Sequence, residues 1–263
     1  MDYKYLSCRL VEESIWKISL SRPDVLNSLN RPMLMELIES LKYASTDRQV
    51  RVILLTGEGR AFSAGQDLKE VIELEGAKAD PGEIVRQTYN PLISLMREIE
   101  KPIICFVNGI AAGAAANIAF ASDIILASKE ASFVQSFSKI GLIPDSGGTY
   151  FLPRLIGLHR SAALMMTADK ISATEAKELG LVYRVFDAEE VEARVMEFSM
   201  ALSQMPTRAL GLIKAALNKT FSNDLPGQLL LESELQAKAG KTGDYSEGVR
   251  AFLEKRKPKY SGK

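Results

Sequence analysis

The stretch from Ile103 to Gly148 constrains the fold of this chain more than any other part of the sequence. It opens with an apolar, β-branched run, 103–107, which predicts a buried strand. The turn signal Asn108-Gly109 follows, and we expect the small residues after it, GIAAGAAAN, to begin an Ala-rich helix. A loop punctuated by Gly and Pro then carries one carboxylate, Asp145. Small residues let another group approach the backbone, and a helix N-terminus offers unpaired N–H groups. The stretch therefore predicts an anion-binding junction near a lone acid.

Composition favours an ordinary globular protein and excludes several functional classes. The 263 residues suffice for one large domain, or for a domain with an appendage, and carry a formal net charge of zero. A neutral chain without a basic stripe gives no reason to expect a nucleic acid or membrane partner. With one histidine, His159, and only two cysteines, the sequence predicts no metal site and no His-based triad. We expect a cytoplasmic protein with reduced thiols.

The order of elements indicates an α/β fold. Residues 3–11 and 14–20 alternate as two strands of a hairpin, and Asn30 is placed to cap a helix with an apolar stripe. Strands joined through helices over 50–186 argue for a core with parallel strands. The polar segment 72–84 predicts a mobile or variable loop. From Glu189 to the end the pattern is helical, which is typical of an appendage or an oligomerisation arm.

Two turns of small residues differ in sequence but occupy the same kind of position in the predicted fold. Ser63-Ala64-Gly65-Gln66 and Gly113-Ala114-Ala115 each lead from a predicted strand into a predicted helix. Side by side in a parallel sheet, such turns would aim two backbone N–H groups at one point, as an oxyanion hole requires. The alternative is that small residues only permit tight packing of helix on sheet.

A series of motifs in fixed order resembles the crotonase (enoyl-CoA hydratase/isomerase) family along nearly the whole chain. The motifs are Arg22-Pro23 with Leu26-Asn27-Ser28-Leu29, Phe62-Ser63-Ala64-Gly65-Gln66-Asp67-Leu68, Asn108-Gly109-Ile110-Ala111-Ala112-Gly113, Ser122-Asp123-Ile124, Gly141-Leu142-Ile143-Pro144 with Gly147-Gly148-Thr149, AKELGLV at 176–182, and Phe252-Leu253-Glu254-Lys255-Arg256. The resemblance implies a crotonase-like spiral of ββα turns over residues 1–200 and a C-terminal helical region over 201–263 that builds trimers or pairs of trimers.

The resemblance also implies an acyl-CoA thioester substrate, with coenzyme A as part of the substrate and no separate cofactor. The thioester oxygen would lie between the backbone N–H groups of Gln66 and Ala114. The coenzyme A moiety would contact the segments that contain Leu26, Ala64, Gly65, Asp67 and Leu68. Lys255, in the basic C-terminal ending, would either meet its phosphates or belong to a solvated tail.

Departures from the family pattern favour an isomerase. Hydratases of the family hold their attacking water with two glutamates, whereas this chain has Asn117 and Phe137 at those positions. Neither an amide nor a phenyl ring can take a proton from water. Asp145 remains, where isomerases of the family carry their carboxylate, although Pro-Asp-Ser-Gly is also good turn chemistry. We expect apolar surroundings, including Phe137, to raise the pKa of Asp145, and Asn117 to orient the substrate or Asp145.

The residues after Gly141 are most similar to those of family members that convert the ring epoxide of phenylacetyl-CoA into an oxepin, in phenylacetate breakdown. Other reactions stay open: Δ3,Δ2-enoyl-CoA or dienoyl-CoA isomerisation, hydration if another acid substitutes, and a dehalogenase type that would need a histidine and a tryptophan in the site. A non-catalytic acyl-CoA-binding or RNA-binding relative is the alternative outside enzymes.

Overall fold

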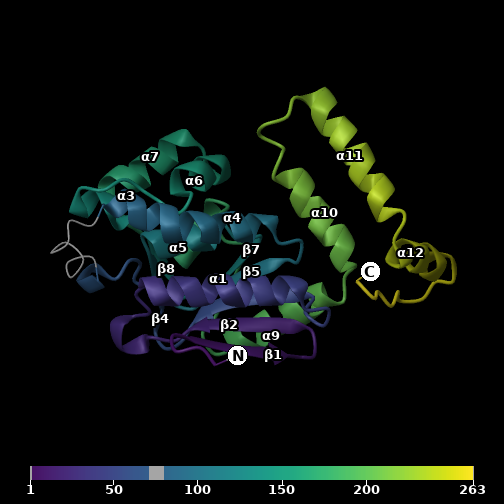
Figure 1. Ribbon diagram of the computed structural model, residues 1–263, viewed down its shortest axis with the longest axis horizontal. Helices are drawn as coiled ribbons and strands as arrows, with labels where there is room; N and C mark the ends of the chain where they lie inside the picture. The colour runs from purple at the N-terminus through teal and green to yellow at the C-terminus, as the bar shows by residue number, and fades with distance from the viewer. Residues whose placement is uncertain (1, 71–79, 263) are drawn as a thin grey trace.

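The protein, described here by a computed structural model of residues 2–70 and 80–262, consists of two sheets and the helices that cover them (Figure 1). The larger sheet has the strand order β1-β2-β3-β5-β7-β10. Its strands are Leu6–Val11, Ile15–Leu20, Val52–Gly57, Ile103–Val107, Ile124–Ser128 and Arg184–Phe186. β1 and β2 form the predicted antiparallel hairpin, and all later neighbours in this sheet pair in parallel.

The smaller sheet has the order β4-β6-β8-β9, and its strands are short. They are Ala61–Ser63, Ile110–Ala112, Ser132–Val134 and Lys170–Ser172. β4, β6 and β8 each follow a strand of the larger sheet after a sharp corner, and they pair in parallel. This repetition of a long strand, a short strand and a helical segment confirms the predicted ββα spiral.

One detail of the central stretch differs from the prediction. The residues after Asn108-Gly109 do not begin a helix; they form β6, and helix α5 (Ala114–Phe120) starts only after Gly113. Strand β6 is favoured because it completes the small sheet between β4 and β8, a long-range pairing that local composition does not encode.

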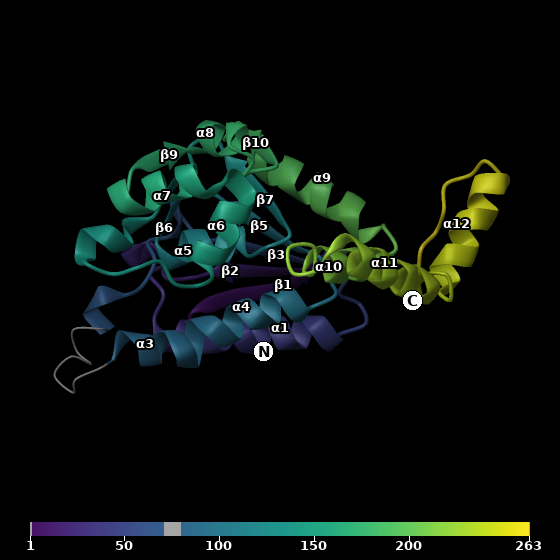
Figure 2. The ribbon, with the colours of Figure 1, turned by 90° about the horizontal axis from the view of Figure 1, so that it is seen from above.

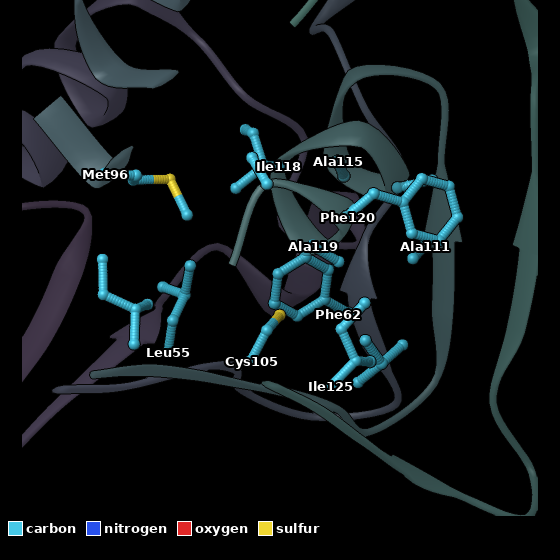
Figure 3. Close-up of a cluster of buried hydrophobic side chains, with 14 of the residues drawn as sticks. Leu55, Phe62, Met96, Cys105, Ala111, Ala115, Ile118, Ala119, Phe120 and Ile125 are labelled. Atoms are coloured by element: carbon cyan, nitrogen blue, oxygen red, sulfur yellow. The ribbon is translucent and has the colours of Figure 1, made fainter. Parts of the chain in front are cut away.

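The apolar runs predicted as buried strands are buried on both faces of the larger sheet. In β3, Ile53 and Leu55 point into one apolar cluster and Leu54 points into another. The first cluster lies under α1 (Arg31–Thr46), α4 (Asn90–Glu98) and α5, and Figure 3 shows part of it. The second lies under α9 (Val191–Ser203). Every residue of α5 is buried, which accounts for its small side chains.

The polar segment 72–84 is only partly within the described residues. Its first eight positions, 72–79, lie outside them. The remainder corrects the expectation of a loop, because α3 (Pro81–Ile84) is helical and runs directly into η2 (Val85–Tyr89), one turn of π-helix ahead of α4. Asp80 begins α3 by accepting a hydrogen bond from the Gly82 N–H at 2.8 Å.

The remaining helices complete the fold: α6 (Gly148–Ile156), α7 (Leu158–Thr167), α8 (Ala173–Glu178), α10 (Thr207–Leu217), α11 (Leu225–Ala239) and α12 (Gly243–Leu253). The last three project to one side of the sheets as an arm (Figures 1 and 2). The predicted boundary at 200–201 falls inside the last turn of α9, just before this arm. Among the described residues no helix has both the length and the apolarity needed to cross a membrane.

A buried ionic cluster fastens the arm to the core. The Asp123 carboxylate accepts from Arg97 on α4 at 2.9 Å and from Lys214 on α10 at 2.8 Å, and it also accepts from the N–H of Ile103 at 2.8 Å. The Lys214 side chain is only 6% exposed. Burial of a cation is tolerated here because the carboxylate compensates it.

Replacing Asp123 with Ala should therefore destabilise the fold by about 3–5 kcal/mol, since two cations would lose their shared counter-ion away from water. The free energy of unfolding in urea measures the effect. Asp187→Ala is the matched control, because Asp187 pairs with Lys129 on the exposed surface and its loss should change little. Equal effects of the two substitutions would contradict the assigned role of Asp123.

Candidate active site

The turns that follow β4 and β6 lie against each other. The two strands are parallel neighbours, so both turns leave the smaller sheet at the same edge. Gly65 and Gly113 have φ values of +88° and +53°, which L side chains rarely adopt. A Cβ atom on Gly65 would lie 2.6 Å from the Ala112 carbonyl oxygen and 3.8 Å from the Ala114 nitrogen. The predicted juxtaposition of the two small-residue turns is thus confirmed.

Two backbone N–H groups at this junction have no acceptor in the part of the chain that the structure describes. Leu29 donates to the Gly65 oxygen at 2.7 Å and accepts from the Asp67 N–H at 2.9 Å, and this pairing bypasses the N–H of Gln66 between them. Ala114 is the first residue of α5, where the N–H has no acceptor within the helix. No described residue accepts a hydrogen bond from either group. Both donors are free to bind an oxygen atom.

Both turns open onto a pocket of about 630 Å³. Seven of the residues predicted for the site line it: Ala64, Gly65, Gln66, Leu68, Ala114, Phe137 and Asp145. Much of the remaining lining is apolar and comes from α3, η2, η3 (Ser136–Ile140) and the loop after η3, including Ile84, Val85, Ile140, Leu142, Ile143 and Pro144. The pocket therefore combines two N–H donors and one carboxylate with an apolar wall.

Asp145 is the one carboxylate among the described residues that line the pocket. It lies in the loop before α6, where its backbone oxygen accepts from the Gly148 N–H at 2.8 Å. Burial raises the pKa of its carboxyl to about 6, against the lowering effect of a 2.8 Å hydrogen bond from the Ser146 hydroxyl. The expected direction of the shift is confirmed, and its cause is loss of solvation.

Asn117 does not line the pocket. Its side chain is fully buried on α5, where its Nδ2 donates to the backbone oxygen of Asp145 at 2.9 Å and its Oδ1 accepts from Gln135 Nε2 at 2.8 Å. Both ends of the amide are therefore engaged by the protein. Of the two roles expected for Asn117, the structure favours orientation of Asp145 through its loop over contact with substrate.

Three other predicted residues also lie outside the pocket lining. Asp67 pairs with Arg22 at 2.9 Å, and the backbone oxygen of Leu26 accepts from the Ala64 N–H at 2.9 Å. These contacts hold residues 22–29 against the turn at 63–66. Asp67 and Leu26 therefore support that turn and do not line the pocket. Lys255 follows α12, and α12 lies at the opposite end of the molecule from α3 (Figures 1 and 2), a helix that contributes Pro81, Gly82 and Ile84 to the pocket lining. Within one chain it is not brought to the site.

Tyr89 is a pocket residue that the sequence analysis missed. It is 1% exposed, and its hydroxyl donates to Oε1 of Gln66. Burial holds its pKa well above the ordinary value, and Asp145 is the charge that contributes most to the same shift. In sequence Tyr89 is one more apolar position at the start of an amphipathic helix. In the structure Tyr89 ends the π-helical turn η2, an element that hydrophobic periodicity does not reveal, and it lines the pocket.

Comparison with known proteins agrees with this geometry. The model of the family described as enoyl-CoA hydratase/isomerase matches residues 11–263. The chain is 44% identical to the 1,2-epoxyphenylacetyl-CoA isomerase of Escherichia coli K12, over 96% of this chain and 97% of the relative. It is 34% identical to the trans-2-decenoyl-[acyl-carrier-protein] isomerase of Streptococcus mutans, over the full length of both.

Solved structures give the same result. The enoyl-CoA hydratase of Bacillus anthracis superposes with a TM-score of 0.91 at 34% identity, covering 99% of this chain and all of that one. The match extends through the spiral core and the C-terminal arm, and the resemblance recognised in the sequence motifs is confirmed. The chain belongs to the enoyl-CoA hydratase/isomerase family, has the crotonase fold and is an enzyme of that family.

Proposed function

We propose that this enzyme isomerises acyl-CoA thioesters with one carboxylate, Asp145, and an oxyanion hole formed by the N–H groups of Gln66 and Ala114. The observation that carries the proposal is the pocket itself. Among the described residues it holds one carboxylate and two N–H donors without an acceptor. The positions at which the resemblance would place the two acids of a hydratase are occupied by Phe137 and by Asn117, which lies outside the pocket lining. Water addition has no described base besides Asp145.

The chemistry follows from these groups. The Asp145 carboxylate removes a proton next to the thioester carbonyl, and negative charge develops on the carbonyl oxygen. The two N–H groups stabilise that charge, each by about 3–4 kcal/mol when judged by removal of a single donor in other enzymes. The protonated carboxyl then returns the proton to another carbon. The atoms of substrate and product are the same, and only the position of one proton and the bonding have changed.

For the acyl group we propose the ring-1,2-epoxide of phenylacetyl-CoA, with the oxepin ester as product. The relative at 44% identity bears the name of this activity, and the pocket supplies the aromatic rings of Phe137 and Tyr89. A proton would move from the carbon beside the thioester to a ring carbon, while the carbon–carbon bond shared by the two rings opens. The second candidate is migration of a double bond in a 3-enoyl thioester, which the apolar lining and the decenoyl relative favour.

Coenzyme A would approach along the turn that contains Ala64 and Leu68, both of which line the pocket. Two cations also line it. Arg86 is already paired with Glu83 at 2.6 Å and Asp80 at 3.1 Å, whereas the described part of the chain gives Lys139 no ion-pair partner. We therefore propose that Lys139 contacts a phosphate of coenzyme A bound to the same chain. Lys255 would contact such a phosphate only in the pocket of another subunit.

Asp145→Asn should abolish isomerisation of 3-hexenoyl-CoA and of enzymatically generated epoxyphenylacetyl-CoA, because an amide cannot carry the proton. Ultraviolet absorbance and product mass follow the reactions, and calorimetry with a saturated acyl-CoA tests binding, which should persist. Asp24→Asn, on the exposed surface, serves as the control. Loss of binding in Asp145→Asn would make Asp145 structural, and rapid hydration of crotonyl-CoA by the unaltered enzyme would refute the lone-acid isomerase.

The pH dependence of the same reaction tests the state of Asp145. As a base it must be ionised in the free enzyme, so kcat/KM should rise with pH through about 6 and stay level above it. The profile of 3-hexenoyl-CoA isomerisation between about pH 5 and pH 8 measures this. An inflection near the ordinary carboxyl value, or no inflection, would contradict the assignment.

We also propose that the enzyme is a homotrimer or a pair of trimers. The arm exposes large apolar side chains that a lone chain would leave in water: Phe221, Leu225, Leu229, Leu230, Phe252 and Leu253. Light scattering coupled to size-exclusion chromatography should give the mass of three or six chains. The mass of a single chain would refute the proposal.

A further inference from the structure

The carboxylate of Asp145 is held by one neighbour, Ser146. The Ser146 hydroxyl donates to Oδ1 of Asp145 at 2.8 Å, and no other described residue donates a hydrogen bond to that carboxylate. Ser146 is 1% exposed and is absent from the pocket lining, whereas Asp145 belongs to it. The hydroxyl therefore reaches the carboxylate from within the protein and not from the pocket.

The backbone of Asp145 is fixed by different contacts. Its carbonyl oxygen accepts from Asn117 Nδ2 at 2.9 Å and from the Gly148 N–H at 2.8 Å. These two contacts do not prevent the side chain from rotating, and a rotating carboxylate would present either oxygen to a substrate. The bond from Ser146 restricts that rotation. It engages Oδ1, and Oδ2 is left without a donor from any other described residue.

The backbone of Ser146 indicates a role beyond that of an ordinary turn residue. Its φ is +51°, a left-handed value that is uncommon for residues other than glycine, and the next residue, Gly147, has a φ of +74°. Glycine at position 146 would adopt the same backbone without strain. Strain of this kind is concentrated at functional sites. Among the described residues, the strained serine directs its hydroxyl to the proposed base.

We propose that Ser146 is a positioning residue, whose hydroxyl holds Oδ1 of Asp145 so that Oδ2 takes up and returns the substrate proton. This inference rests on the proposed function for the role of Asp145 as the base. In the reaction, a carbon next to the thioester loses a proton to Oδ2, and the same oxygen then donates that proton to another carbon. Ser146 keeps its own proton and donates to Oδ1 throughout. One fixed oxygen thus serves both steps.

The same hydrogen bond stabilises the ionised carboxylate and lowers the pKa of Asp145, against the larger rise that burial causes. The other titratable side chains of the pocket lining are Arg86 and Tyr89 on η2 and Lys139 on η3. None of these three is a cause of the shift. Helix α5 carries no titratable side chain, Asp67 is paired with Arg22, and on α6 Tyr150 and Arg154 contact each other. Removal of the hydroxyl should therefore raise the pKa of Asp145.

Two substitutions that remove the hydroxyl test the proposal, because they differ in their tolerance of the left-handed backbone. Ser146→Ala keeps a Cβ atom at a φ of +51°, and Ser146→Gly relieves that strain. In both, the inflection of kcat/KM for 3-hexenoyl-CoA should lie about one pH unit above that of the unaltered enzyme, the tenfold change that one hydrogen bond to a charged group is worth. At about pH 8, kcat should fall at least about fivefold through loss of orientation, while affinity for hexanoyl-CoA stays within about twofold.

Ser161→Ala is the matched control. Ser161 is also 1% exposed, and its hydroxyl also donates one hydrogen bond at 2.8 Å, to the Gly157 oxygen, but it lies on α7 outside the pocket lining. This variant should keep the inflection of the unaltered enzyme. An unchanged inflection in Ser146→Ala would overturn the proposal. So would an inflection that moves in Ser146→Ala and not in Ser146→Gly, because backbone strain and not the hydroxyl would then be the cause.

Titration of Asp145 itself separates this inference from the proposed function. Isotopic labelling of the aspartate carboxyl carbons follows the group by NMR without any substrate, and the Asp145→Asn variant identifies its signal. The signal should titrate about one pH unit higher in both Ser146 variants than in the unaltered enzyme. The same titration in all three would overturn the proposal. If the unaltered enzyme isomerises neither 3-hexenoyl-CoA nor the epoxide, the proposed function fails, and this titration still decides whether Ser146 holds the carboxylate.

Discussion

The contact between the turns that follow β4 and β6 is the constraint on which the rest of the structure depends. Two backbones can approach this closely only where no side chain intervenes, and Gly65 and Gly113 meet that condition with φ values that disfavour any other residue. The parallel pairing of short strands brings the turns to one edge, and the small residues of α5 let that helix begin there while buried on all sides. The pocket is a consequence of this junction.

Around the junction, polar groups are either engaged by the protein or left for a ligand. Asn117 uses both ends of its amide, one on Gln135 and one on the backbone oxygen of Asp145, so its side chain holds the loop that carries Asp145. The same burial that stabilises this amide pair withholds water from the Asp145 carboxyl and raises its pKa to about 6. A carboxyl in that range exchanges protons readily near neutral pH, which suits the proposed role of Asp145 as a base that also returns the proton.

The sequence predicted much of the spiral and part of the site, for reasons that particular residues make plain. The apolar runs of β3 and β5 predicted strands because burial on both faces leaves no room for polar alternation. Asn30 predicted the start of α1 because its side chain caps locally, and it accepts from the Met33 N–H at 3.0 Å. The short strand β6 was predicted as helix, since three residues between turn signals carry too little pattern and their partners lie far away in sequence.

By itself, the sequence determined the elements whose physics is local or periodic: buried strands, capped helices, turns of small residues, and the placement of Asp145 in a turn. Its motifs determined the family. Tertiary structure alone decided which groups meet. It engaged both ends of the Asn117 amide outside the pocket lining and placed Tyr89, at the end of a π-helical turn, in that lining. These outcomes depend on the packing of segments distant in sequence, where burial and pairing are settled by neighbours that local patterns do not specify.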